Sequence, residues 1–154
     1  MFAPARCEAA VDLLEEPLEI NGALMSPKEF SQKMRDDYER LYCLPDDRAR
    51  SEPPDDRSID SALAVMSRLN LKCFTPSRII PSAEGGVGLC FALNGKYADF
   101  ECFNDGAVLA AITDRRDLVE VFEVNPASHQ EIDHAISRMQ HFLGQTASAV
   151  SPVC

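Results

Sequence analysis

Two carboxylates and a tyrosine alternate along one predicted strand of this 154-residue chain, at Tyr97, Asp99 and Glu101. Side chains two residues apart on a strand point to the same side, so the two carboxylates lie within about 7 Å of each other. Such a pair can bind a divalent metal, or its two pKa values can separate for acid–base chemistry. Metal catalysis needs further ligands, and the spacing assigns none. The alternative is that both acids are simply solvated on an open sheet face.

A second candidate is the glycine-rich segment Glu84-Gly85-Gly86, which precedes the strands. It lacks the Lys-Ser/Thr ending of a Walker A loop, and the helix that follows a dinucleotide-binding fingerprint is replaced by a strand. Glycines allow another backbone or a ligand to approach closely. The loop is therefore either a ligand- or partner-contact loop or a tight bend into the sheet.

Cysteines and histidines form no recognisable site. The six cysteines include no C-x-x-C pair, and a cysteine nucleophile would need a histidine that the sequence does not place. Cys90 and Cys102 fall within strands, where thiols act as small buried hydrophobes. His129, His134 and His141 fall in or at the start of the last predicted helix without H-x-x-x-H spacing, which is typical of surface histidines. We expect no catalytic residue, no metal and no cofactor.

An antiparallel meander between Gly86 and Val124 positions the acidic pair. Asn94-Gly95 predicts a two-residue type I′ turn, which needs positive φ at both residues and pairs Leu93 with Lys96. Counted outward from this turn, the register separates an apolar face from a face that carries the acids. The apolar face consists of Val87, Leu89, Phe91, Ala98, Phe100 and Cys102.

The second hairpin, at Asn104-Asp105-Gly106, leaves two alternatives open. A two-residue turn directs Leu109 and Ala111 to the core, whereas a three-residue turn with a bulge at Gly106 directs Val108, Ala110 and Ile112 there. A fourth strand is predicted over 118–124, with both faces apolar enough to be buried. Ile79-Ile80 is a candidate for a short first strand that ends at Pro81.

Three helices are predicted around these strands. Ser26-Pro27-Lys28-Glu29 is a capping box with proline at the first helical position, and its helix runs to about Cys43. Ser58 is predicted to cap a second helix that ends near Asn70. A second capping box, Ser128 with Glu131, begins a helix that ends at Gly144 and covers the apolar sheet face. A short helix over 7–15 is a further candidate.

Together these elements predict an α+β fold in a single domain over 1–154. It consists of an antiparallel β-meander of about four strands, flanked by two N-terminal helices and by one C-terminal helix packed on one sheet face. Residues 44–57, LPDDRARSEPPDDR, predict a flexible acidic and proline-rich loop because they have no apolar period. Residues 145–154 predict a mobile tail.

Charge and composition restrict the class of partner. The formal net charge is −10, and the acidic excess is denser in the half that forms the sheet. This charge disfavours direct nucleic-acid binding and suits a basic protein partner, although solubility alone would also account for it. The first residues do not resemble a signal peptide, and no apolar run is long enough to cross a membrane. With scattered cysteines, these features predict a cytoplasmic protein with reduced thiols.

Three motifs resemble a group of small bacterial proteins of uncharacterised function. The motifs are Pro81-Ser82-x-Glu84-Gly85-Gly86-Val87, Glu101-x-x-Asn104-Asp105-Gly106 and Glu120-Val121-Phe122-Glu123-Val124. In that group a proline- and glycine-rich entry leads into an antiparallel sheet, often with tryptophan where this chain has Phe91. The resemblance covers about 80–124. It implies a bacterial or phage-related origin and an α+β sheet, and it implies no catalytic residue.

These observations favour a non-catalytic acidic protein-binding module of the antitoxin, immunity-protein or inhibitor kind. Its predicted contact residues are Glu84, Tyr97, Asp99 and Glu101 on the polar sheet face and the adjacent loop, and the 44–57 loop is the next candidate contact. One alternative is a small enzyme that uses Asp99 and Glu101 with a metal, or a thiol. Another is a small-ligand sensor whose Gly85-Gly86 loop closes a pocket against the sheet. The sequence leaves the oligomeric state open.

Overall fold

The computed structural model describes residues 17–20, 23–42 and 52–144 as an α+β fold with two antiparallel sheets. None of the described helices is long and apolar enough to cross a membrane. The described elements are, in order, β1 (Leu18–Ile20), β2 (Ala23–Met25), α2 (Pro27–Tyr42), α3 (Asp56–Leu71), β3 (Arg78–Pro81), β4 (Gly86–Leu93), β5 (Lys96–Phe103), β6 (Val108–Asp114), β7 (Asp117–Val124) and α4 (His129–Leu143).

The main sheet is a five-stranded meander in the order β3-β4-β5-β6-β7. Each strand pairs with the next one along the chain, so every connection is a short hairpin. The prediction of about four strands was one short, because the candidate strand at Ile79-Ile80 is part of β3 and pairs with β4. Pro81 ends β3, as predicted.

The two central hairpins fix which residues share a face. The predicted pairing of Leu93 with Lys96 is confirmed, and Asn94 and Gly95 both have positive φ, at 55° and 76°. In the second hairpin the three-residue alternative holds, with Gly106 at a φ of 93° and its N–H donated to the Phe103 carbonyl at 3.0 Å. The apolar residues of β6 that face the core are therefore Val108, Ala110 and Ile112.

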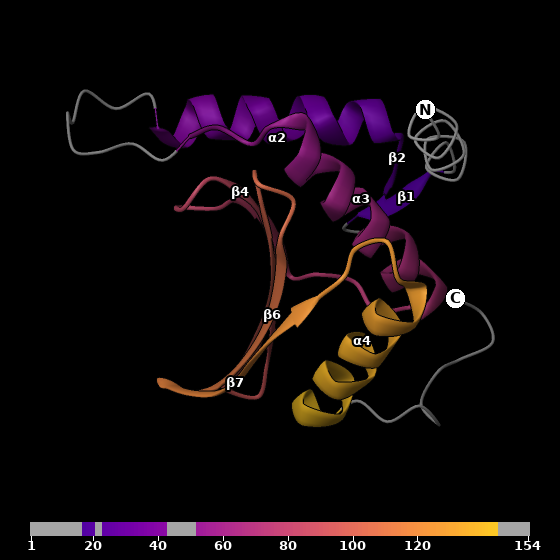
Figure 1. Ribbon diagram of the computed structural model, residues 1–154, viewed down its shortest axis with the longest axis vertical. Helices are drawn as coiled ribbons and strands as arrows, with labels where there is room; N and C mark the ends of the chain where they lie inside the picture. Colours follow the sequence, from indigo (N-terminus) through magenta and orange to yellow (C-terminus); the bar gives the residue numbers. More distant parts are fainter. Residues whose placement is uncertain (1–16, 21–22, 43–51, 145–154) are drawn as a thin grey trace.

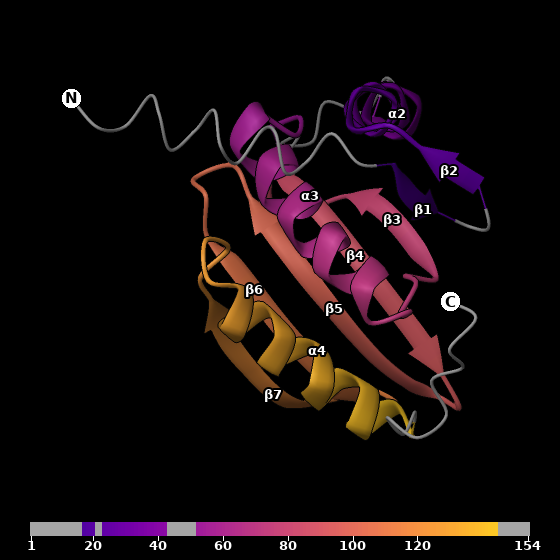
Figure 2. The same ribbon diagram turned by 90° about the vertical axis from the view of Figure 1, so that its right-hand side faces the viewer.

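Helices α3 and α4 lie side by side on the apolar face of the sheet (Figures 1 and 2). The prediction placed only the C-terminal helix there. Five strands span about 20 Å, which is twice the width of one helix, so a single helix could not cover the face. The Arg68 guanidinium of α3 joins the two helices by donating to both carboxylate oxygens of Asp133 on α4, with Nε to Oδ1 at 2.8 Å.

Helix α2 lies next to the β3 edge of the sheet (Figure 2). Its predicted capping box is confirmed, because the Ser26 N–H donates to Glu29 Oε2 at 2.7 Å and the Glu29 N–H donates to Ser26 Oγ at 3.2 Å. Phe30 and Met34 on its inner face are fully buried. Ahead of it, β1 and β2 form a small ribbon that was not predicted, since three-residue strands are too short to show a period.

Asn104 connects the start of α3 to the sheet. The predicted cap at Ser58 was wrong: Asp55 is the N-cap and its carboxylate accepts from the Ser58 N–H at 2.9 Å. Asn104 Oδ1 accepts from the Asp55 N–H at 3.0 Å, and Asn104 Nδ2 donates to the Pro53 carbonyl at 2.9 Å. The last residues of the predicted 44–57 loop are thus part of α3 or held against the sheet.

Other predicted segments fall where the structure gives no description. The candidate helix over 7–15, the tail over 145–154 and the loop residues up to 51 all lie outside the described residues.

Strand β7 is less buried than predicted. Its outer-strand position leaves Leu118, Val119 and Val121 exposed by 64%, 56% and 46%. The prediction that both faces of this strand are buried was therefore wrong, because it did not include the position of the strand at the sheet edge.

The glycine-rich loop approaches the sheet closely at Gly86. Its φ is +138°, and a Cβ there would lie 2.0 Å from the Cys102 carbonyl oxygen. Gly85 also has positive φ, and its carbonyl accepts from the Asn104 N–H at 3.2 Å. The loop is therefore a tight bend whose glycines are required by its own backbone geometry.

We expect Gly86→Ala to lower the free energy of unfolding by about 3 kcal/mol, because strain at positive φ adds to a clash with the backbone of β5. Urea unfolding monitored by circular dichroism measures this. Gly95→Ala is the matched control, since Gly95 has positive φ but open space around its added Cβ. Gly95→Ala should lower the free energy of unfolding by only about 1 kcal/mol. Equal losses in the two variants would contradict the close approach at Gly86.

Candidate functional site

The candidate site is the sheet face opposite α3 and α4, which no described helix covers (Figure 1). The sheet is curved, and this face lies on the inside of the curve. We call it the uncovered face. Cross-strand pairing orders its side chains in two rows: Arg78, Cys90, Asp99, Ala111 and Val121, and Ile80, Gly88, Glu101, Leu109 and Glu123.

Asp99 occupies the centre of this face. It lies on the middle strand, with Cys90 and Ala111 as its direct cross-strand neighbours. Neither neighbour offers a positive charge, so the carboxylate loses water without gaining a counter-ion. Burial first, and then the negative charge of Glu101, raise the pKa of Asp99 to about 6. The alternative that both acids are freely solvated does not describe Asp99, since a solvated carboxylate keeps its ordinary pKa.

Two successive hydrogen bonds through Ser82 connect Glu101 to the glycine-rich loop. Its Oε1 accepts from Ser82 Oγ at 3.1 Å, and the same hydroxyl accepts from the Glu84 N–H at 3.2 Å. Ser82 is only 3% exposed, so the hydroxyl has a fixed place. The loop therefore fixes the position of Glu101.

The four predicted contact residues form one strip instead of a compact cluster. Tyr97, Asp99 and Glu101 follow β5 over about 14 Å on the uncovered face. Tyr97 is 48% exposed at one end. Glu84 is exposed in the loop beyond Glu101 and connects to it through Ser82. The predicted residues thus share one surface, in the order that the strand register requires.

Two residues of this surface were missed from the sequence. Ser82 was noted only as part of the motif that begins at Pro81, and the side chain of Arg78 was not placed because the pairing of β3 with β4 was not predicted. The available signal was the β-branched pair Ile79-Ile80 before Pro81, which predicts a strand but is too short to show which way Arg78 points. Arg78 is exposed at the β3 end of the row that contains Asp99.

The described thiols do not provide a nucleophile. Cys102 is fully buried, and burial, followed by the charge of Glu101, raises its pKa to about 12. Burial and the charge of Asp99 also raise the pKa of Cys90. A raised pKa keeps a thiol protonated and unreactive. Both are free thiols, whereas Cys73 is in a disulfide, which departs from the expectation of reduced cysteines.

The acidic pair suits a cation supplied by a partner better than a metal ion. Within residues 17–20, 23–42 and 52–144, no group of three or more His, Cys, Asp or Glu side chains is placed to hold a metal. Metal ions in proteins usually take more ligands than one carboxylate pair provides. An ammonium or guanidinium group needs only one or two carboxylate oxygens. The site can therefore bind a positively charged side chain with the residues that it has.

Asp99→Asn should stabilise the protein at pH 7, because the variant no longer holds a partly buried charge without a counter-ion. Since the folded-state pKa is raised from 3.8 to about 6, the contribution of Asp99 to the stability of the wild type falls as pH rises from 4 to 6. The variant should lack that fall. Allowing for solvent screening of a partly exposed group, we expect a gain of about 1 kcal/mol at pH 7 and none below pH 4.

Urea unfolding across pH 3.5 to 8 measures the effect, with Glu84→Gln as a control that removes an exposed carboxylate. The control should change stability by less than about 0.5 kcal/mol. A loss of stability in Asp99→Asn at pH 7 would contradict the assigned environment.

Comparisons with known proteins add no further constraint. No protein-family model, curated protein or solved structure matches this chain.

Proposed function

We propose that this chain is a non-catalytic acidic protein-binding module that binds a basic protein through its uncovered face. The observation that carries the proposal is the partly buried Asp99 carboxylate beside Glu101, at the centre of the sheet face that none of the described helices covers. An arrangement that is unfavourable for the isolated chain becomes favourable when a partner supplies a positive charge.

The surroundings of the acids suit a lysine or arginine side chain. Apolar groups from Ile80, Leu109 and Val121 occupy the same two rows as the carboxylates. The aliphatic stems of lysine and arginine pack on such groups while the charged end reaches the acids. Tyr97 adds an exposed aromatic ring, and tyrosine is frequent in protein-binding surfaces. The uncovered face thus offers apolar contact and charge together.

The overall charge supports the same class of partner. A net charge of −10 attracts a basic protein over the screening distance and raises the rate of association. It also makes association dependent on salt, because dissolved ions screen exposed charges. An antitoxin, immunity protein or inhibitor acts by this kind of binding, and each neutralises a partner without catalysing a reaction.

The test is capture of basic proteins from a native lysate at low salt by immobilised full-length chain, followed by release at high salt. We expect Asp99→Asn/Glu101→Gln to lose the captured protein, with affinity reduced at least tenfold, about 1.4 kcal/mol. Calorimetry with the purified partner measures the reduction. The loss should occur although the variant is at least as stable as the wild type at pH 7.

The matched control is Asp56→Asn/Asp60→Asn, which removes two exposed carboxylates from α3 on the opposite side of the sheet. This control has the same net charge as the double variant of the uncovered face, so it separates a local contact from overall charge. Equal loss of binding in both variants, or capture that does not depend on salt, would contradict the proposal.

A further inference from the structure

The outer side of β7 is an unpaired strand edge. In the part of the chain that the structure describes, β7 pairs only with β6 and ends the five-stranded sheet. The opposite edge is protected, because β3 is short, ends at Pro81 and lies next to α2. β7 instead spans Asp117–Val124 and exposes Leu118, Val119 and Val121.

The hairpin hydrogen bonds determine which backbone groups of β7 point outward. The Phe103 N–H donates to the Ala107 carbonyl at 2.8 Å, so β6 directs the backbone groups of residues 109, 111 and 113 toward β5. Residues 108, 110 and 112 then bond to β7 through Val124, Phe122 and Glu120. The backbone N–H and C=O groups of Val121 and Glu123 therefore point away from the sheet.

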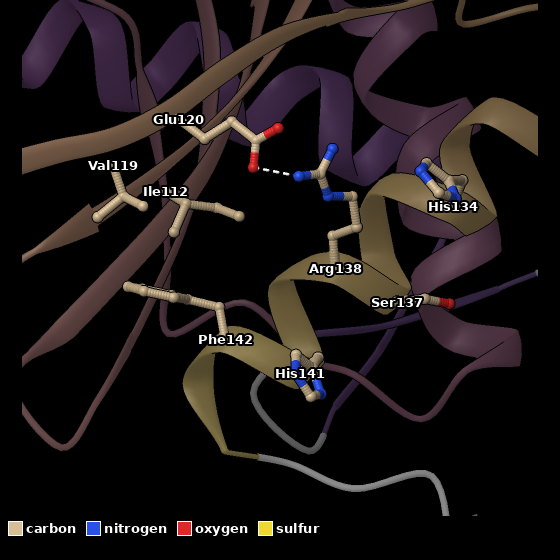
Figure 3. Close-up of a pocket in the computed structure, with 8 residues that line it drawn as sticks. All are labelled: Ile112, Val119, Glu120, His134, Ser137, Arg138, His141 and Phe142. Atoms are coloured by element: carbon tan, nitrogen blue, oxygen red, sulfur yellow. Dashed lines mark hydrogen bonds and ion pairs between the residues drawn. The ribbon is translucent and has the colours of Figure 1, made fainter.

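Two pockets open beside this edge, on the side of α4. One of about 370 Å³ is lined by Ile112, Val119 and Phe142, with the Arg138–Glu120 ion pair across it (Figure 3). The other, of about 420 Å³, is lined by Phe122, Val124 and His134, among others. They follow one another along β7. Alternate side chains of an added strand lie about 7 Å apart on one side, a spacing that suits consecutive pockets.

We propose that β7 is a docking edge at which an extended basic segment of a partner protein adds as a sixth strand. Apolar residues of that segment enter the two pockets beside α4, and alternate basic residues lie on the uncovered face next to Glu123. The basic character of the partner rests on the proposed function, whereas the place and the strand geometry rest on the edge itself.

Charge favours a basic segment over a second copy of this chain. β7 carries Asp117, Glu120 and Glu123, and Arg138 forms an ion pair with Glu120. Arg115 and Arg116 lie in the turn before β7, so the uncompensated acid along the strand itself is Glu123. Pairing two β7 strands would bring these acids from both copies to one seam, between chains that each have a net charge of −10. A strand with lysines opposite the acids removes this repulsion.

The probe is a capped synthetic peptide of alternating lysine and valine, as long as β7, added to the full-length chain. Amide hydrogen exchange measured by NMR should slow at Val121 and Glu123 by about tenfold or more when the peptide is bound. The same peptide with N-methyl groups on alternate residues cannot complete the ladder and should not bind. Because this second arm leaves the protein unchanged, it does not depend on the folding of a variant.

Val121→Pro removes one outward N–H at an edge position that tolerates proline, and it should weaken peptide binding by at least about tenfold. Val121→Thr is the matched control: it keeps the N–H and should bind within about threefold of the wild type. Thermal unfolding of both variants shows whether the sheet is intact.

Three results would overturn the proposal: absence of peptide binding, binding without slower exchange at Val121 and Glu123, or equal binding of the N-methylated peptide. Sedimentation equilibrium that shows a dimer whose Val121 and Glu123 amides are already protected would also overturn it, in favour of a second copy. The proposed function can fail while the β7 proposal holds. That would be the case if Asp99→Asn/Glu101→Gln captures as much protein as the wild type does, and the peptide still slows amide exchange at Val121 and Glu123.

Discussion

The pairing register of the meander is the constraint on which the rest of the structure depends. Side chains on a strand alternate between faces, so a shift of one residue exchanges the entire apolar and polar sets. The turn at Asn94-Gly95 sets this register, and it places Leu89 and Phe100 in the core with Asp99 on the other side. A shift would bury two carboxylates under α3 and α4 without a counter-ion, and the loss of their hydration would strongly destabilise the fold.

The register also concentrates unfavourable electrostatics on one surface. Helices α3 and α4 pack on the apolar face, whereas the acids lie on the face that no described helix covers. Ser82 and Asn104 hold the loop and the start of α3 in place at the Glu101 end of this surface. The result is a surface on which two carboxylates lie near each other while their direct cross-strand neighbours carry no positive charge.

Local rules predicted the features that depend on a few adjacent residues. The capping box at Ser26 formed as the sequence indicates, and so did the turn at Asn94-Gly95. At Ser128 only the cap itself formed, because the Glu131 N–H donates to Ser128 Oγ while the Glu131 carboxylate accepts from the Asn125 N–H instead of from Ser128. The face of Asp99 and Glu101 followed from that turn by counting. The partial burial of Asp99 did not follow, because it depends on neighbouring strands and on the curvature of the sheet.

Features that depend on distant contacts were missed. Asp55 is the cap of α3 because Asn104, 49 residues later, holds its backbone, and no local pattern indicates that. The exposure of Val121 results from the position of β7 at the edge, which needs the strand order. The need for a second helix on the apolar face follows from the width of the five-stranded sheet. That width was underestimated because β3, the additional strand, is only four residues long.

The most direct test of this account is the pKa of the Asp99 side chain, followed by NMR of its carboxyl carbon in the full-length chain. We predict a pKa of about 6 in the free protein, and a fall toward ordinary values when a basic partner is bound. A pKa near 3.8 in the free protein would show a solvated carboxylate without need of a counter-ion, and it would contradict the account.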